Sequence, residues 1–206
     1  MPTRVAVIYY SATGNVHEIA DAIAEGAREE GAEVRVRRVA EIAPEAVIRE
    51  NEDWHAHHQA TKDTVDEATL DDLEWADGIA LGTPTRFGNP AAQLKLFIDT
   101  AGGLWAEGKL ADKAATSFTS AANEHGGQES TILALNNVFY HWGSIIIPPG
   151  YTDERLYAAG GNPYGTSFVA GQDGADPGDE TRTAGRIQGR RLARVATALA
   201  GARASA

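Results

Sequence analysis

Short apolar runs and amphipathic stretches alternate along the whole chain, and this alternation constrains the fold more than any other feature. Residues 4–10 (RVAVIYY) form a β-branched and aromatic run typical of a buried strand. Apolar residues then repeat at helical spacing from Val16 to Ala27, and Gly31 ends that helix. Further strands are predicted at 33–39, 78–83, 114–119 and 144–147, and further helices after Asn89-Pro90, at 130–142 and at 181–204. Five strands alternating with helices predict an α/β fold, a doubly wound parallel sheet with helices on both faces.

The length of 206 residues fits one domain over residues 1–206. Two segments depart from the alternating pattern. Residues 44–75 are acidic and poorly periodic, and we expect an insertion with one short helix. Residues 148–178 are rich in Gly, Pro, Asn and Asp and predict a long loop without regular structure. A loop of that length in a compact domain is usually functional or packs against a partner.

Charge and composition exclude several classes of function. The net charge is −11, from 29 acidic and 18 basic residues, so a phosphate backbone or an anionic membrane surface is an unfavourable partner. The chain has no cysteine, which excludes disulfides, thiolate catalysis and cysteine-based metal sites. No apolar stretch approaches the ~20 residues of a membrane span, and the N-terminus lacks a signal-peptide pattern. These features predict a cytoplasmic protein.

The loop after the first strand, Ser11-Ala12-Thr13-Gly14-Asn15-Val16, has the composition of an anion site. Hydroxyls, an unhindered glycine and a helix N-terminus would hold a phosphate by neutral donors, because the loop contains no Lys or Arg. The Gly-Lys-Ser/Thr of a nucleotide triphosphate loop and the three spaced glycines of a dinucleotide loop are both absent. An ordinary strand–helix turn with a Ser or Thr cap remains the alternative.

Two more loops should meet the first, because ligands in such sheets bind beyond the carboxyl ends of the strands, where the strand order reverses. In residues 84–89 (PTRFGN), backbone N–H groups could bind the polar edge of a flavin while Phe87 shields the ring. A tight turn that docks Phe87 in the core is the alternative. In residues 119–127 (TSAANEHGG), small side chains would let the backbone approach a flat ring closely.

These loops together resemble the WrbA family of flavodoxin-like NAD(P)H:quinone oxidoreductases. The motifs that carry the resemblance are SATGN at 11–15, GTPTRFGN at 82–89, TAGGLW at 100–105, GGQE at 126–129 and HWG at 141–143. The resemblance covers essentially the whole chain. It implies FMN as the cofactor, NADH or NADPH and a quinone as substrates, a two-electron reduction by a ping-pong mechanism, and a homotetramer.

The resemblance also implies roles for individual positions. His141 would border the flavin as the catalytic residue, and Trp105 would form part of the substrate pocket. Thr13 stands where many members have an aromatic residue near the nicotinamide, so it is placed in the substrate site as well. The remaining cofactor-binding positions are Ser11, Ala12, Gly14, Asn15 and Val16 for the phosphate, and Thr85, Arg86, Phe87, Gly88, Ser120, Ala121, Ala122, Asn123 and Gly126 for the isoalloxazine ring.

Other interpretations of the same residues stay open. His141 could instead be a histidine favoured at a helix C-terminus, and Trp105 could serve core or interface packing. The run Trp54-His55-Ala56-His57-His58 lacks ordered metal-ligand spacing and is interpreted as a solvated surface, with no metal site. A flavodoxin-type electron carrier without its own quinone pocket is the main alternative function. A flavin-free interaction module would leave the three loops without a role.

Overall fold

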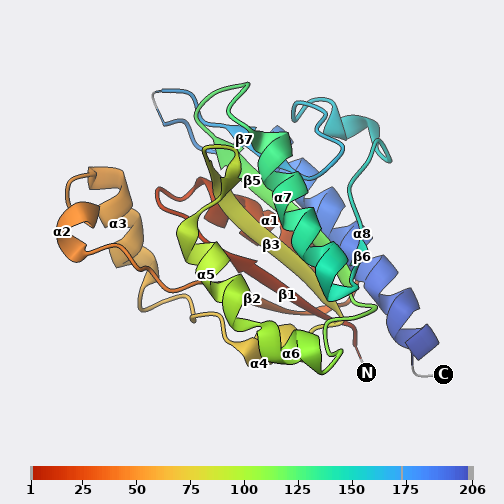
Figure 1. Ribbon diagram of the computed structural model, residues 1–206. Coiled ribbons are helices and arrows are strands. Elements are labelled where there is room, and N and C mark those ends of the chain that lie inside the picture. The colour runs from red at the N-terminus through yellow and green to blue at the C-terminus, as the bar shows by residue number, and fades with distance from the viewer. Residues whose placement is uncertain (1, 173, 204–206) are drawn as a thin grey trace.

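A computed structural model describes residues 2–172 and 174–203 and shows a twisted parallel sheet between two helical layers (Figure 1). The strands along the sheet have the order β2-β1-β3-β5-β6. Their bounds are β1 (Arg4–Tyr9), β2 (Glu33–Arg38), β3 (Gly78–Arg86), β5 (Ala114–Ala121) and β6 (Ile145–Ile146). All four pairings along this path are parallel, so the predicted α/β fold with five parallel strands is confirmed. The order reverses between β1 and β3.

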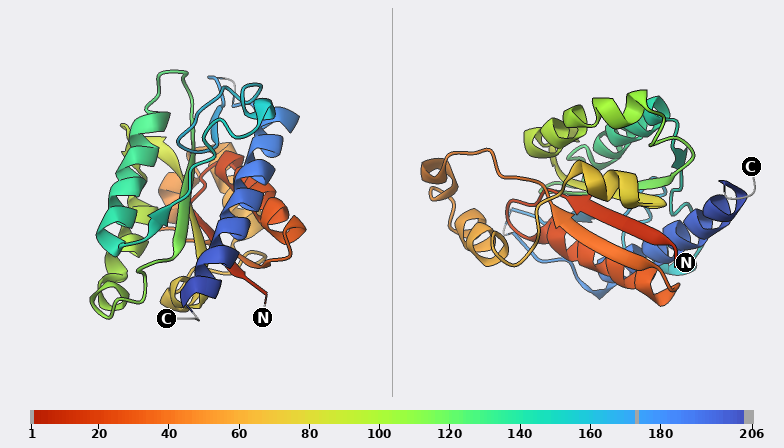
Figure 2. Two further views of the ribbon diagram at one scale, coloured as in Figure 1. Left: turned by 90° about the vertical axis from the view of Figure 1, so that its right-hand side faces the viewer. Right: turned by 90° about the horizontal axis from the view of Figure 1, so that it is seen from below.

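Helices cover both faces of the sheet (Figure 2). On one face lie α1 (Asn15–Glu29) and the long α8 (Asp179–Arg203). The predicted end of the last helix, residue 204, lies outside the described residues. On the other face lie α5 (Ala92–Thr100), α6 (Gly102–Ala106) and α7 (Gln128–Trp142), with the short α4 (Leu70–Trp75) near the edge.

Alternating side chains of β1 build both halves of the core, because successive residues of a strand point to opposite faces. Val5 and Val7 are fully buried against α1 and α8, whereas Ala6 and Ile8 are buried on the face of α5 and α7. The apolar run that predicted a buried strand therefore supplies two cores, and β1 lies in the middle of the molecule.

Helices α1 and α8 pack unusually closely through glycines. A Cβ on Gly26 of α1 would overlap the backbone carbonyl of Arg186, and a Cβ on Gly189 of α8 would overlap the carbonyl of Ile23. Two ion pairs, Arg186–Glu25 and Arg190–Glu29, flank this contact. Because α1 follows the first loop directly, α8 fixes the position of the helix that presents that loop.

The insertion at 44–75 is more regular than the sequence predicted. It contains three helices, α2 (Glu45–Ile48), α3 (Glu52–Thr61) and α4, where one short helix is expected. The start of α3 is capped by Asn51, whose side-chain oxygen accepts a hydrogen bond from the N–H of Trp54 at 2.9 Å. In Figure 1, α2 and α3 stand out from the side of the molecule, away from the two helical layers.

The prediction that Asn89-Pro90 caps a helix is wrong. These two residues form β4 (Asn89–Pro90), which pairs antiparallel with the end of β3, and the N-cap of α5 is Ala91. Thr83 explains the shift, since its hydroxyl accepts a hydrogen bond from the N–H of Ala91 at 2.9 Å and so anchors the helix start to β3.

The long segment 148–178 also holds regular structure, contrary to the expectation of a featureless loop. It contains a 3-10 turn, η1 (Glu154–Leu156), and a strand, β7 (Ser167–Val169). Strand β7 pairs in parallel with the last residues of β5, beyond the short β6 on the same side. A strand of three residues in a Gly- and Pro-rich segment leaves no detectable alternation, which is why sequence patterns miss it. Among the described residues, no helix has the length and apolar character needed to cross a bilayer.

Candidate functional site

The structure brings the three predicted loops together around one cleft of about 940 Å³, at the carboxyl ends of β1, β3 and β5. The cleft therefore lies at the point where the strand order reverses, the position at which this fold type binds FMN. Sequence-predicted residues that line it are Ser11, Ala12, Thr13, Asn15, Val16, Thr85, Arg86, Phe87, Ser120, Ala121, Ala122, Asn123 and Gly126.

The first loop turns sharply from β1 into α1. Its Ser11 hydroxyl accepts a hydrogen bond from the N–H of Gly14 at 3.1 Å, which closes the turn. Gly14 has φ 109°, a conformation that disfavours residues with a Cβ, and it precedes α1 without any side-chain cap. The first N–H groups of α1 are thus presented without a capping side chain, next to the hydroxyls of Ser11 and Thr13. Gly14 allows this turn but does not itself line the cleft.

The second loop is a β-hairpin. Strand β3 continues through Arg86, and the two-residue turn Phe87-Gly88 leads into β4. Both turn residues have positive φ, 53° and 73°, as a type I′ turn requires. The ring of Phe87 is fully exposed, with a relative exposure of 102%, at the edge of the cleft. The alternative in which Phe87 docks in the core is therefore excluded.

The hairpin is tied to the start of α7. The Thr85 hydroxyl donates a hydrogen bond to the carbonyl of Gly127 at 3.2 Å, and the Ser130 hydroxyl donates one to the carbonyl of Gly88 at 3.1 Å. The close approach of the two segments requires glycine, because a Cβ on Gly127 would lie 2.8 Å from the Cα of Gly88. The second and third loops are consequently held in fixed positions relative to each other.

The third loop follows β5 and is closed by its own backbone. The carbonyl of Asn123 accepts hydrogen bonds from the N–H of Gly126 at 3.0 Å and from the side chain of Gln128 at 2.8 Å. The side-chain oxygen of Asn123 accepts a third from Gln172 at 2.9 Å, which connects the segment after β7 to the cleft.

Two groups of lining residues were not predicted from the sequence. Both come from the segments that were expected to lack structure, where no motif marked them. The missed residues are Asn51, Asp53, Ala56 and His57 of the insertion, and Ala170, Gly171, Gln172, Gly174 and Asp176 after β7.

His141 and Trp105 lie away from this cleft within one chain. Helix α7 begins at Gln128 beside the third loop and runs back along the sheet, so His141 lies about 20 Å further along the helix. The indole Nε1 of Trp105 donates a hydrogen bond to the backbone carbonyl of His141 at 2.7 Å. Both residues line a separate groove of about 460 Å³, together with Ile98, Val138 and Trp142. Trp105 is 54% exposed there.

The cleft fits FMN on the chemistry of its lining. A phosphate monoester requires hydrogen-bond donors, which the first turn of α1, Ser11 and Thr13 supply. A flat apolar ring requires small neighbours and an aromatic cover, which Ala121, Ala122 and the exposed Phe87 supply. The fold and the cleft together define a flavodoxin-like, FMN-binding class of protein.

Comparison with known proteins shows to which family within this class the chain belongs. Residues 3–153 match the model of the NADPH-dependent FMN reductase family. An NAD(P)H dehydrogenase (quinone) of Deinococcus radiodurans is 49% identical over 169 residues, which cover 82% of this chain and 84% of the relative. One from Paracoccus denitrificans is 44% identical, covering 98% and 97%. The fold is shared with a flavodoxin, WrbA-like protein from Agrobacterium tumefaciens, with a TM-score of 0.65 and 24% identity over 95% of this chain and 98% of that one. The chain belongs to the NAD(P)H dehydrogenase (quinone) family of flavodoxin-like proteins.

Proposed function

We propose that this protein is an FMN-dependent NAD(P)H:quinone oxidoreductase in which one cleft serves both substrates in turn. The observation that carries the proposal is the single cleft of about 940 Å³ in which the phosphate-type loop, the Phe87 hairpin and the small-residue loop meet. When bound there, FMN supplies the redox chemistry, taking two electrons from a nicotinamide and passing them to a quinone. Because one opening admits both substrates, the nicotinamide product leaves before the quinone binds.

The residues of the cleft bind and orient the reactants, since the cofactor carries the hydride chemistry and no strong acid or base is needed. Residues 11–16 hold the FMN phosphate, and residues 85–88 and 120–126 hold the ring. Thr13 is exposed in the first loop and lines the cleft, which supports a contact with the nicotinamide nucleotide in this proposal. Phe87 covers one edge of the ring and keeps water from it.

His141 and Trp105 serve a cleft of another subunit in this proposal. Their groove is apolar and exposed, and about 20 Å of helix α7 separates His141 from the cleft of its own chain. A homotetramer, as the family resemblance implies, would place the groove of one subunit against the cleft of the next. Trp105 would then bind the quinone, and His141 would donate a proton to the reduced quinone oxygen. Light scattering at working concentration tests the assembly, and a monomeric mass would contradict it.

The function is tested by purifying the protein, identifying its flavin and measuring NADH and NADPH oxidation with benzoquinone. We expect bound FMN and quinone-dependent oxidation of the nicotinamide. FAD as the bound flavin, or no flavin after saturation, would refute the cofactor assignment. FMN without quinone-dependent turnover would identify an electron carrier instead.

A further inference from the structure

Helix α3 of the insertion forms one wall of the cleft, a role that the sequence did not predict. Asp53, Ala56 and His57 all line the cleft, and their spacing places them on one face of the helix. Helix α3 is attached to the body of the protein through Trp54 on an adjoining face, whose indole Nε1 donates a hydrogen bond to Glu41 at 3.0 Å. Glu41 also accepts hydrogen bonds from Tyr10, directly after β1, at 2.8 Å and from Gln93 of α5 at 2.7 Å, so this network holds α3 in place.

Within this wall, the imidazole of His57 is packed against the phosphate loop. A Cβ placed on Gly14 would lie 3.6 Å from its Nδ1. Its ring meets the ring of His17 edge to face with centroids 5.4 Å apart, and His17 in turn stacks on Tyr9 at 5.0 Å. Among the described residues, no side chain or backbone group is hydrogen-bonded to the ring nitrogens of His57. An imidazole with this packing and free nitrogens suits a ligand in the cleft.

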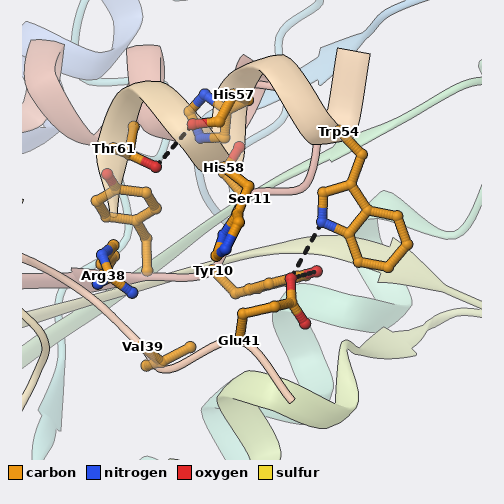
Figure 3. A pocket seen from close by; sticks show the side chains of 10 residues that line it. Tyr10, Ser11, Arg38, Val39, Glu41, Trp54, His57, His58 and Thr61 are labelled. Carbon is orange, nitrogen blue, oxygen red and sulfur yellow. Dashed lines mark hydrogen bonds between the residues drawn. The ribbon is translucent and has the colours of Figure 1, made fainter. Parts of the chain in front are cut away.

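Figure 3 shows the other side of this residue, a cavity of about 20 Å³ between α3 and the start of the first loop. The cavity is small, so the ring has little room to move away from the cleft. Tyr9 contributes to its lining, and the buried Tyr9 hydroxyl has no hydrogen-bond partner within the described part of the chain. His57 therefore has little free space on the protein side, and on its other side it lines the cleft beside the phosphate loop.

The charged and titratable groups around His57 come from every neighbouring element. They are Tyr9 of β1 and Tyr10 directly after it, His17 and Asp21 of α1, Arg38 of β2, Glu41 of the following segment, and Asp53 and His58 of α3. Burial, followed by the charges of His17 and His58, lowers the pKa of His57 to about 4. Arg38 is occupied elsewhere, since it donates hydrogen bonds to the carbonyls of Lys62 and Val65 and pairs with Glu67. Near neutral pH, His57 is thus uncharged in the protein without a ligand.

We infer that His57 is a further ligand of the FMN phosphate, supplied by the insertion and not by the phosphate loop. The loop itself has no Lys or Arg, so a phosphate dianion held there would be neutralised only by backbone and hydroxyl donors. A neutral imidazole next to Gly14 donates one N–H to a phosphate oxygen. The dianion in turn favours the protonated ring, so binding is strengthened by a proton taken up at His57 as the pH falls.

The inference rests on the proposed binding of FMN in the cleft, and riboflavin separates the two claims because it has the same ring without the phosphate. Dissociation constants of FMN and riboflavin are measured by flavin fluorescence for the wild type, His57→Leu, His57→Gln and the control His55→Gln. His55 is a suitable control because it lies on the same helix, pairs with Glu45 at 3.7 Å and does not line the cleft. We expect His57→Leu to weaken FMN binding about tenfold or more and to leave riboflavin binding unchanged.

The pH dependence adds a second criterion. Gln keeps a hydrogen-bond donor but cannot take up a proton, so the ratio of the FMN dissociation constants of His57→Gln and the wild type should rise as the pH falls from 8 to 5.5. The titration of the phosphate of free FMN cancels in this ratio, because the same free ligand is used with both proteins. Independently of any variant, NMR titration of the wild-type His57 ring should show a higher pKa with FMN than with riboflavin.

Each outcome is decisive. Equal loss of FMN and riboflavin binding in His57→Leu would reduce His57 to a packing residue and overturn the inference, as would unchanged FMN binding. If the variant does not fold, an NMR pKa of His57 that is the same with FMN and riboflavin overturns it. A wild-type protein that binds neither flavin would refute the proposed function itself, and the inference with it.

Discussion

Phe87 has a left-handed backbone conformation, which disfavours a bulky residue such as phenylalanine. This makes it the most informative residue to change. It is the first residue of a two-residue type I′ turn, with φ 53°, where Asn is strongly preferred before Gly. Its side chain is fully exposed and gains nothing from burial in the free protein. The substitution Phe87→Asn should therefore stabilise the protein without flavin and weaken its flavin binding.

Two free energies set the expected magnitudes: the backbone strain at Phe87 and the contact of its ring with the flavin. A left-handed conformation costs a bulky residue about 1 kcal/mol, which Asn largely avoids. For a chain of this size, a gain of about 1 kcal/mol raises the Tm of the flavin-free protein by about 2–4 °C. Loss of the ring next to the flavin should cost about 2 kcal/mol of FMN binding, close to a thirtyfold higher Kd.

Thermal unfolding of the flavin-free protein and fluorescence titration with FMN measure the two effects separately. Phe87→Tyr, which keeps both the strained backbone and the aromatic ring, should match the wild type in both assays. A lower Tm for flavin-free Phe87→Asn would show that the turn is not strained. An unchanged Kd for FMN would show that the ring does not cover the flavin.

Four further predictions concern the flavin site, the Glu41 network and the kinetics. Ser11→Glu should abolish FMN binding, because a carboxylate in the first loop repels the phosphate; retention of FMN on gel filtration would place the phosphate elsewhere. For Glu41, burial alone would raise the pKa, but hydrogen bonds from Gln93, the N–H of Ala43, Tyr10 and Trp54 hold it below its ordinary value. The ionised Glu41 therefore stabilises the folded protein above about pH 4.3, and this stabilisation is lost as the pH falls through the lower pKa of the folded state. Glu41→Gln should lower the free energy of unfolding, measured in urea, by about 2 kcal/mol at pH 7 and by less in acid. In steady-state kinetics, double-reciprocal plots at varied NADH and quinone should give parallel lines; intersecting lines would exclude the ping-pong scheme. In stopped flow, His141→Ala should slow the quinone half-reaction about ten- to a hundredfold. If neither half-reaction changes, His141 is structural.

The sheet was predictable from the sequence because its strands are short apolar runs bounded by turns. The run at 4–10 and the run at 114–119 are buried on both faces, so every residue contributes to the signal. The meeting of three loops in one cleft also follows from the parallel arrangement, since the carboxyl ends of parallel strands share one edge.

The remaining parts of the site depend on tertiary contacts that leave no local pattern. Helix α3 has few apolar residues and is positioned by the Glu41 network, so neither its bounds nor the placement of His57 in the cleft could be predicted from periodicity. Strand β7 is defined only by its pairing with β5. The distance of His141 from the cleft results from the direction of α7, which motif matching does not consider.

The packing of α8 on α1 has a consequence for the order in which the protein is assembled during synthesis. The ion pairs Arg186–Glu25 and Arg190–Glu29 join residues 161 positions apart, so α1 leaves the ribosome long before its partner helix exists. Until α8 is made, the face of α1 around Gly26 is uncovered, and the loop that α1 presents lacks a fixed support. Binding of the yellow cofactor would then come last. The flavin absorbance of a preparation would report the fraction of chains in which α8 has packed on α1.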